Sequence, residues 1–245
     1  MAEEKEKKED SLHKEHRARV KQRVRDHGLA GMAEHEVLEF LLFFSIPRRD
    51  TNPLAHRLIE HFGGFCKVME ATEEELLQVE GVGPNSAQLI TALREVCGYY
   101  SLQRSHQTGV PLKKPDACIE YVTPLFFGKR NEILYLIAMD DGCIPLRDVK
   151  VAEGLPNHVS YDSRKMVRDM VATGCTRCFI AHNHPNGLAW VSEADFMATC
   201  SMVQALGAVG IEVVDHIIVG TDGAYSLAGH QRMPIYDTVS GRVMY

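Results

Sequence analysis

The chain has 245 residues, of which 45% are hydrophobic and 24% are charged, and its formal net charge is −6. This composition excludes a disordered or collagen-like chain and leaves enough apolar sequence for one or two globular domains. The apolar runs at 37–46 and 133–139 are shorter than the roughly 20 residues that cross a bilayer, so we expect no membrane contact. The first ten residues lack the apolar stretch of a signal peptide, and we therefore expect a cytoplasmic protein whose seven cysteines are reduced.

A basic stretch follows these first ten residues, which we expect to be frayed or disordered because they carry little that can be buried. Six basic side chains stand against two acidic ones between residues 14 and 26. Such a stretch is either the solvated face of a helix or an arm that contacts phosphates. In the second case Arg17, Arg19 and Arg23 are the expected DNA contacts, although the negative net charge gives the whole chain no general attraction to nucleic acid.

Apolar residues at helical spacing predict helices at 34–44 and 52–62, which end near a proline and at a pair of glycines. The next segment, residues 72–95, predicts two short helices joined by a turn. Thr72 and Glu75 form the capping-box pattern that begins the first of these helices. The sequence GVG at residues 81–83 supplies the turn, and apolar residues return at helical spacing after it.

The GVG turn resembles that of the helix-hairpin-helix motif, in which an alanine follows the second glycine by four residues, as Ala87 does here. The resemblance implies that Gly81 and Gly83 let the backbone approach DNA, so that N–H groups of the second helix bind a phosphate without reading the sequence. Members that bind DNA often carry a lysine or arginine after the turn, where this chain has PNS at 84–86. The alternative is a glycine turn that only packs two helices together.

A polar segment with glycine and proline predicts a linker at 105–114. It separates a helical domain at 1–104, with its hairpin at about 72–95, from a second domain at 115–230, and 231–245 form a tail of unassigned role. In the second domain strand-like and helix-like patterns alternate, at 133–139, 145–151, 163–173, 178–181, 193–208 and 211–219. The fold class is therefore α+β, an all-α region followed by a sheet layered with helices.

The most informative sequence is CFIAHNHPNGLAWVSEADF at 178–196. An apolar strand leads into His182 and His184, and the two-residue period of a strand puts both imidazoles on one side. Two imidazoles that face together suit a divalent metal such as Zn²⁺. Ser192 begins a helix from which Asp195 supplies a third ligand, and three protein ligands leave a fourth position for water, as in catalytic zinc sites.

Each part of this pattern also has a purely structural alternative. Paired histidines occur on ordinary surfaces, and Ser192 with Asp195 forms a capping box that can serve only its helix. Trp190 either shapes the mouth of the site or anchors the core. Asp215 and His216 are either a pair that orients a ligand or, as we favour, a buried structural pair.

The spacing H-x-H, seven residues, S, two residues, D is the JAMM motif of the JAB/MPN metallohydrolases, to which a glutamate on an upstream strand, here Glu132, also belongs. Together with HRARVKQRVRDHGLAGM, the GVG turn, AHNHPNG and VVDHIIVG, the motif makes residues 16–230 similar to the bacterial RadC family. This resemblance implies a helix-hairpin-helix region followed by a JAB/MPN domain with a cytidine deaminase-like mixed sheet flanked by helices. It also implies that His182, His184 and Asp195 ligate one Zn²⁺ ion per chain.

The resemblance further implies that Glu132 is a general base and that Ser192 stabilises the oxyanion. The expected function is a zinc-dependent hydrolase of amide bonds that acts on a peptide or protein and associates with DNA, as in DNA repair. The competing hypothesis is a DNA-binding or interaction protein with a non-catalytic metal site, which has no need of Glu132. Two departures from the family pattern, Asn186 in place of a serine and LAWV at 188–191 in place of a turn with proline and acid, remove no ligand.

Overall fold

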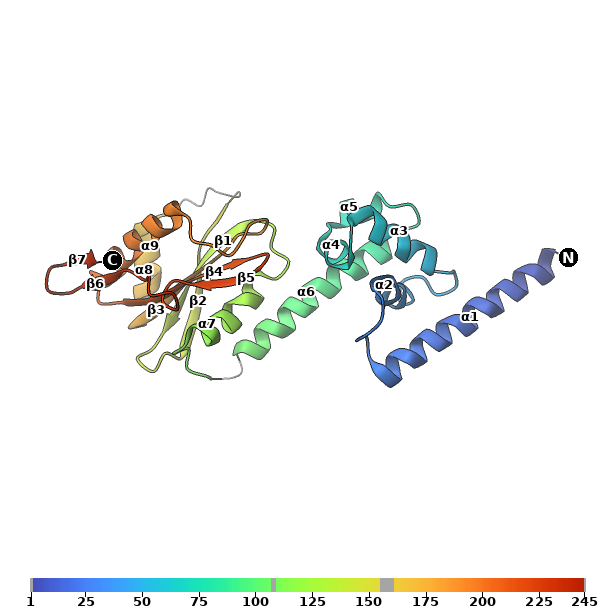
Figure 1. Ribbon diagram of the computed structural model, residues 1–245, viewed down its shortest axis with the longest axis horizontal. Coiled ribbons are helices and arrows are strands. Elements are labelled where there is room, and N and C mark those ends of the chain that lie inside the picture. Colours follow the sequence, from blue (N-terminus) through green and yellow to red (C-terminus); the bar gives the residue numbers. More distant parts are fainter. Residues whose placement is uncertain (1, 107–108, 155–160, 245) are drawn as a thin grey trace. The chain divides into compact units, whose positions relative to one another are not determined.

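The computed structural model describes residues 2–106, 109–154 and 161–244, and Figure 1 shows its helices and strands. The chain divides into two compact units, Met1–Cys97 and Gly98–Tyr245. The division falls within α6 (Pro84–His106), which occupies the first two positions of the predicted linker. Residues 107–108 of that linker lie outside the described residues. None of the helices in the described ranges combines the length and the hydropathy of a membrane span.

The first unit is built from helices: α1 (Ala2–His27), α2 (Glu34–Leu42), α3 (Asn52–Phe62), α4 (Phe65–Glu70), α5 (Glu73–Leu77) and the start of α6. Its core surrounds fully buried residues such as Leu38, Leu58 and Ile90. Of the two expectations for residues 1–10, a frayed or a disordered start, the disordered one is wrong, because α1 begins at Ala2. Alanine, glutamate and lysine favour the helical state, so a run of mixed charge does not by itself prevent a helix.

The segment between α5 and α6 shows why one of its glycines is needed. Thr72 caps α5 as predicted, since its hydroxyl oxygen accepts the N–H of Glu75 at 3.2 Å and the Glu75 carboxylate accepts the N–H of Thr72 at 2.8 Å. Gly81 has a φ of 97°, and a Cβ there would lie 3.1 Å from the Arg57 guanidinium. A Cβ at Gly83 would meet nothing within 4 Å. Of these two glycines, the fold requires only Gly81.

The second unit contains a five-stranded mixed sheet flanked by helices, which confirms the predicted fold class. Its main elements are α7 (Pro115–Val122), the 3₁₀ helix η1 (Thr123–Phe126), β1 (Glu132–Met139), β2 (Pro145–Gly154), α8 (Ser163–Val171), β3 (Arg177–Asn183), α9 (Glu193–Gly207), β4 (Glu212–Gly220) and β5 (Gly223–Ser226). The strand order is β2-β1-β3-β4-β5. Strands β3 and β4 pair in parallel, and the other neighbours pair antiparallel.

Alternate residues of the strands face opposite layers of this unit. On one face, Ile137 and Phe179 belong to a core with α7 and η1. On the other face, Ile180 belongs to a core with α8 and α9. Because His182 and His184 follow Ile180 at two-residue spacing, the alternation directs both imidazoles to the face that α9 covers.

A small hairpin lies within the predicted tail at 231–245. It consists of β6 (Ile235–Asp237) and β7 (Arg242–Met244), which pair antiparallel and contact α9. The contact is close at Gly207, where a Cβ would lie 2.3 Å from Cγ of Tyr236, so a larger residue does not fit. The hairpin is therefore a packed part of the second unit.

Candidate metal centre

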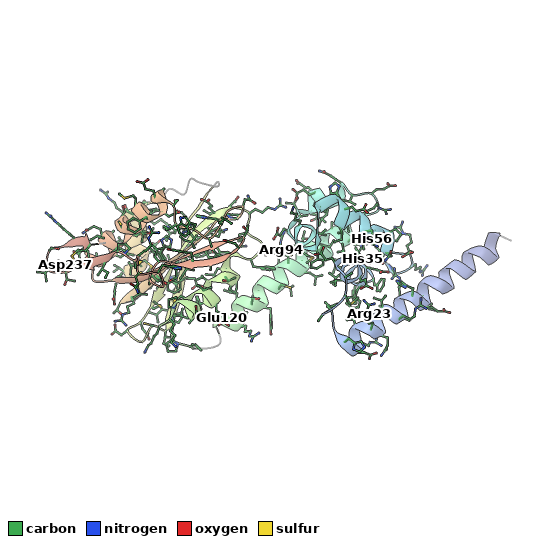
Figure 2. The ribbon with its side chains drawn as sticks, in the orientation of Figure 1. Arg23, His35, His56, Arg94, Glu120 and Asp237 are labelled. Carbon is green, nitrogen blue, oxygen red and sulfur yellow. The ribbon has the colours of Figure 1, made fainter. Side chains whose placement is uncertain are left out.

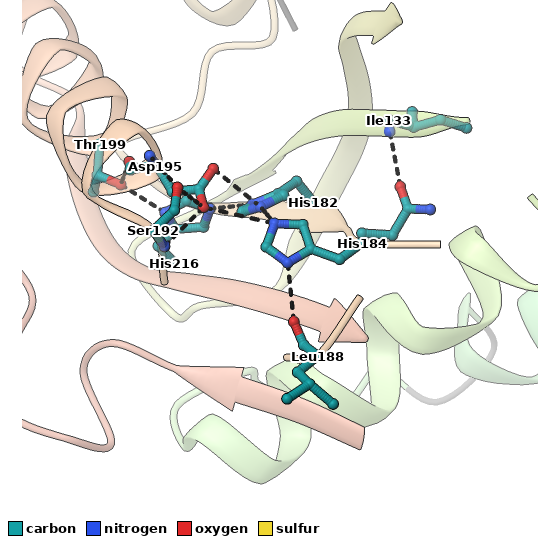
Figure 3. Close-up of polar contacts among 9 residues, drawn as sticks. Ile133, His182, His184, Leu188, Ser192, Asp195, Thr199 and His216 are labelled. Atoms are coloured by element: carbon teal, nitrogen blue, oxygen red, sulfur yellow. Dashed lines mark hydrogen bonds and ion pairs between the residues drawn. The ribbon is translucent and has the colours of Figure 1, made fainter. Parts of the chain in front are cut away.

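The three side chains predicted as metal ligands come together at one end of the sheet (Figure 3). His182 lies in β3, His184 directly follows this strand, and Asp195 lies in the first turn of α9. Their ligand atoms all lie within 4.8 Å of one another. Nε2 of His182 is 2.8 Å from Nε2 of His184 and 3.4 Å from Oδ1 of Asp195, and Nε2 of His184 is 3.6 Å from Oδ2 of Asp195.

A chain of buried hydrogen bonds leads away from His182. Its Nδ1 lies 2.7 Å from Nε2 of His216 on β4, and Nδ1 of His216 lies 2.7 Å from Oγ1 of Thr199 on α9. The Thr199 hydroxyl donates to the backbone carbonyl of Asp195 at 2.6 Å. The side chains of His182, His216 and Thr199 are all buried. This series of hydrogen bonds thus begins at the His182 side chain and ends at the backbone of Asp195 (Figure 3).

These partners assign the protons of the His182 ring. A carbonyl oxygen only accepts, so Thr199 gives its single hydroxyl proton to Asp195 and accepts the Nδ1–H of His216. Nε2 of His216 then carries no proton and accepts the Nδ1–H of His182. Nε2 of a neutral His182 is therefore unprotonated and has a free lone pair.

The ring of His184 is assigned by the same reasoning. Its Nδ1 lies 3.0 Å from the carbonyl oxygen of Leu188, which requires a proton on Nδ1 and leaves Nε2 unprotonated in the neutral ring. Two lone pairs and the Asp195 carboxylate then face one another, and they repel unless a cation lies between them. A proton on Nε2 of His184 is one such cation, and a metal ion is another.

The loop that carries Leu188 is itself held in place. The N–H of Ala189 donates to the Asp222 carboxylate at 2.7 Å. At Gly220 in β4, a Cβ would lie 2.2 Å from the backbone nitrogen of Ala189, so the loop packs directly on the strand. The Leu188 carbonyl therefore has a defined position beside His184.

The pKa values of the three groups follow from burial and from their mutual contacts. Burial lowers the pKa of His182 to about 4. Contact with Asp195 raises the pKa of His184, with further contributions from the Leu188 carbonyl and the Glu132 carboxylate. Burial raises the pKa of Asp195, but its contacts with His184, His182 and a serine outweigh burial and hold this pKa well below its usual range. A neutral imidazole and an ionised carboxylate at pH 7 are groups that bind divalent metals.

Ser192 is the N-cap of α9 and touches the candidate ligand. Its hydroxyl oxygen accepts the N–H of Asp195 at 3.1 Å, and Oδ2 of Asp195 accepts the N–H of Ser192 at 3.0 Å. The Ser192 hydroxyl also donates to this Oδ2 at 2.6 Å. The capping box that the sequence offered as a structural alternative therefore exists, and it presents Asp195 to the two histidines at the same time.

Glu132, the predicted base, lies at the start of β1 and is 8% exposed. Leu134 pairs with His182 in the antiparallel register of β1 and β3. Glu132 is two residues before Leu134 and His184 is two residues after His182, so the two side chains are in line on the same face of the sheet. The Glu132 carboxylate is close enough to contribute to the raised pKa of His184.

The arginines predicted to contact DNA have mostly internal partners. The Arg17 guanidinium donates to two backbone carbonyls of the 46–49 loop, one of them at 2.6 Å. Arg23, labelled in Figure 2, pairs with Glu36 at 2.6 Å. Arg19 is exposed. Arg17 and Arg23 thus hold α1 to the rest of the helical unit, and their role toward DNA stays a prediction.

A cavity of about 650 Å³ opens beside the predicted hairpin. Gly81, Gly83 and the first residues of α6 line it, together with Arg48 and Arg49 from the loop before α3. Neither of these two arginines was expected from the sequence. The available signal was their adjacency in an irregular segment directly after Pro47.

Other residues near the metal centre differ from expectation. Thr199 was missed, although its place four residues after Asp195 puts it one helical turn away on the same face. Of the pair Asp215 and His216, only the His216 ring reaches a candidate ligand, while Asp215 accepts the backbone N–H of His216. Trp190 is 60% exposed, so it is not a core anchor.

Comparison with known proteins identifies the family of the chain. Residues 112–232 match the family model of the RadC-like JAB domain. A UPF0758 protein of Ruegeria pomeroyi is 30% identical over 207 residues, which cover 84% of this chain and 92% of the relative. Fold and domain match together define a JAB-domain protein. More particularly, the chain belongs to the RadC family, as its sequence motifs predict.

Proposed function

We propose that this protein is a zinc-dependent hydrolase of amide bonds. The observation that carries the proposal is the convergence of the Nε2 atoms of His182 and His184 with the Asp195 carboxylate, all within 4.8 Å of one another. The donor set fits Zn²⁺, which binds imidazole nitrogen and carboxylate oxygen and has three protein ligands in catalytic sites. Zinc held by these residues supplies a Lewis acid that lowers the pKa of water from 15.7 to about 7.

Two further side chains complete the proposed chemistry. The Glu132 carboxylate takes the proton of the attacking water and gives it to the leaving amine, and its place in line with His184 supports this role. The Ser192 hydroxyl donates to the substrate oxygen on which negative charge develops. Because this hydroxyl donates to Asp195 at 2.6 Å, that hydrogen bond has to break before Ser192 can serve the substrate.

The surroundings of the centre favour a peptide over a nucleic acid as the substrate. The negative charges of Asp195 and Glu132 both contribute to the raised pKa of His184. These two carboxylates repel a negatively charged phosphodiester. Leu188 and Trp190, in the loop between the ligands, are 63% and 60% exposed and suit apolar side chains of a peptide.

Metal content tests the metal centre directly. The purified full-length protein should contain close to one zinc ion per chain, because three ligands converge on one point. His184→Ala should lose most of this zinc, whereas His230→Ala, which removes an exposed histidine of the same unit, should keep it. A wild-type protein that takes up no zinc from solution would contradict the proposal, as would a His184→Ala variant that binds zinc like the wild type.

Glu132→Gln separates hydrolysis from metal binding. Glu132 is a base and not a ligand in this proposal, so the variant should keep its zinc and lose about 10²- to 10⁴-fold in the rate of peptide hydrolysis. Glu153→Gln is the matched control, because Glu153 is an exposed residue of β2, which pairs with β1. Equal hydrolysis by the Glu132 variant and the wild type contradicts the assignment of the base. A zinc-loaded wild type that cleaves no peptide supports the competing hypothesis of a non-catalytic metal site.

The cavity at the hairpin supports DNA binding as a second function. It combines the N-terminus of α6 with two guanidinium groups, and both features suit a phosphate. The double change Arg48→Ala and Arg49→Ala should weaken binding to DNA of any sequence and reduce the salt slope of the affinity by about 2. Arg164→Ala with Arg232→Ala, which removes two exposed arginines of the other unit, is the control for loss of charge.

Gly83→Ala tests the same surface without loss of charge. The space around a Cβ at this position is open, so the unfolding temperature should stay that of the wild type. A methyl group on this turn would obstruct a phosphate that approaches the backbone, and DNA affinity should fall. DNA affinities that are unchanged in both the arginine and the glycine variants would exclude this surface, and with it the DNA-repair role based on it.

A further inference from the structure

His216 and Thr199 connect two candidate ligands through the interior of the second unit. Neither is one of the three residues whose ligand atoms converge. Thr199 is 0% exposed and His216 is 1% exposed, so solvent does not satisfy their polar atoms. Two buried polar side chains in such a place require a role, and their hydrogen bonds indicate one.

A bulge in β4 aims the His216 ring. Cys178 of β3 pairs with Val213, but Ile180 pairs with His216, so β4 has one more residue than β3 over this stretch. An extra residue of this kind reverses the alternation of side chains beyond it. Without it, Asp215 would lie opposite Ile180 in place of His216. The bulge therefore brings the imidazole to α9, where Nδ1 meets Thr199.

Only one arrangement of protons satisfies all three hydrogen bonds between His182, His216, Thr199 and the Asp195 carbonyl. If Nε2 of His182 were protonated, its Nδ1 would need the Nε2–H of His216. Nδ1 of His216 would then be unprotonated and would face Oγ1 of Thr199 at 2.7 Å. The single proton of that hydroxyl is directed to the Asp195 carbonyl at 2.6 Å, so two buried acceptors would face each other without a proton. The opposite tautomer of His182 thus costs a buried hydrogen bond.

We infer that His216 and Thr199 are positioning residues for the metal centre. They hold His182 in the tautomer whose Nε2 is free to bind a metal, and they tie that histidine to the turn of α9 that carries Asp195. Partners that fix the tautomer of a metal-binding histidine also raise its basicity. The inference rests on the proposed metal site and names the interior residues on which the geometry of that site depends.

The tautomer of His182 is measurable without any metal. In ¹⁵N NMR spectra of the metal-free, full-length protein at pH 8, His182 should carry its proton on Nδ1. Thr199→Val keeps the shape of the side chain and removes the hydroxyl, and His216→Leu removes the acceptor, so the Nε2–H form should appear in both. Thr199→Ser should restore the wild-type spectrum. Ser226→Ala is the control, because it removes a different buried hydrogen bond, the one of 2.6 Å to Asp215.

Zinc affinity, measured by competition with a chelator, gives the second readout. It should fall by about 10- to 100-fold in Thr199→Val and His216→Leu, recover in Thr199→Ser and stay unchanged in Ser226→Ala. If His216→Leu does not fold, the two Thr199 variants still decide the question. A wild-type His182 with its proton on Nε2, or variants with wild-type tautomer and affinity, would overturn the inference. A wild type that has the expected tautomer but binds no zinc would overturn the proposed function instead.

Discussion

His182 makes the stability of the metal-free protein depend on pH. Burial lowers its pKa to about 4, whereas a histidine in an unfolded chain has a pKa of about 6.5. Between these two pH values the unfolded chain binds a proton here that the folded chain does not, so stability falls as the pH falls, by about 1.4 kcal/mol per pH unit. Burial also lowers the pKa of His216, so this residue changes the stability in the same direction as the pH falls. The raised pKa of His184 opposes them, since the folded chain binds that proton more readily.

A comparison of two histidine variants isolates this effect. Between pH 7 and pH 5, the metal-free wild type should lose about 2 kcal/mol more unfolding free energy than His182→Gln, because only the wild type keeps this imidazole buried and neutral. Urea unfolding followed by the fluorescence of Trp190, the sole tryptophan, reports on the second unit. His27→Gln, which changes an exposed histidine of the first unit, should behave like the wild type. Equal losses in the wild type and His182→Gln would contradict the lowered pKa.

At the scale of elements, α5 and α9 each begin with a capping box, but only the box of α9 contains a candidate metal ligand. The Thr72 hydroxyl oxygen accepts an N–H at 3.2 Å, and that of Ser192 accepts one at 3.1 Å. Thr72→Ala and Ser192→Ala should therefore each destabilise their own unit by about 1 kcal/mol. Only Ser192→Ala should also reduce peptide hydrolysis, because its box contains Asp195 and its hydroxyl is the proposed oxyanion donor.

Two measurements compare Thr72→Ala with Ser192→Ala: the free energy of unfolding and the rate of hydrolysis by the zinc-loaded protein. Similar losses of stability with unequal losses of rate support a role for Ser192 beyond its cap. If the Thr72 variant loses as much rate as the Ser192 variant, the capping box acts on hydrolysis only through stability, and the proposed donor is wrong.

The elements also show what a sequence can predict in this protein. Local patterns sufficed for β1, β2, β3, β4, α8 and α9 of the second unit, for the capping boxes, and for the shared side of His182 and His184. They did not indicate α7, η1, β5 or the hairpin of β6 and β7. The bulge that brings His216 to the site was not predictable, because it exists only in the pairing of β4 with β3. For the same reason Thr199 and Arg48 were missed, since their neighbours come from other elements.

At the scale of the whole molecule, each unit has a hydrophobic core of its own. The first unit is built around residues such as Leu38 and Leu58, and the second around the two faces of its sheet, with residues such as Phe179 and Ile180. The candidate metal ligands all belong to the second unit. A ligand that binds only a folded unit stabilises that unit. The described residues of the first unit contain no such cluster of candidate ligands.

Zinc should therefore raise the unfolding temperature of one unit and not of the other. Zinc at about 100 times its Kd adds about 2.7 kcal/mol to the unit that binds it, so calorimetry of the full chain should show one shifted and one unshifted transition. Leu58→Ala should lower only the unshifted transition, because loss of a buried leucine costs about 2–5 kcal/mol in its own core. His184→Ala should abolish the zinc shift. If zinc moves both transitions, the two units do not unfold independently.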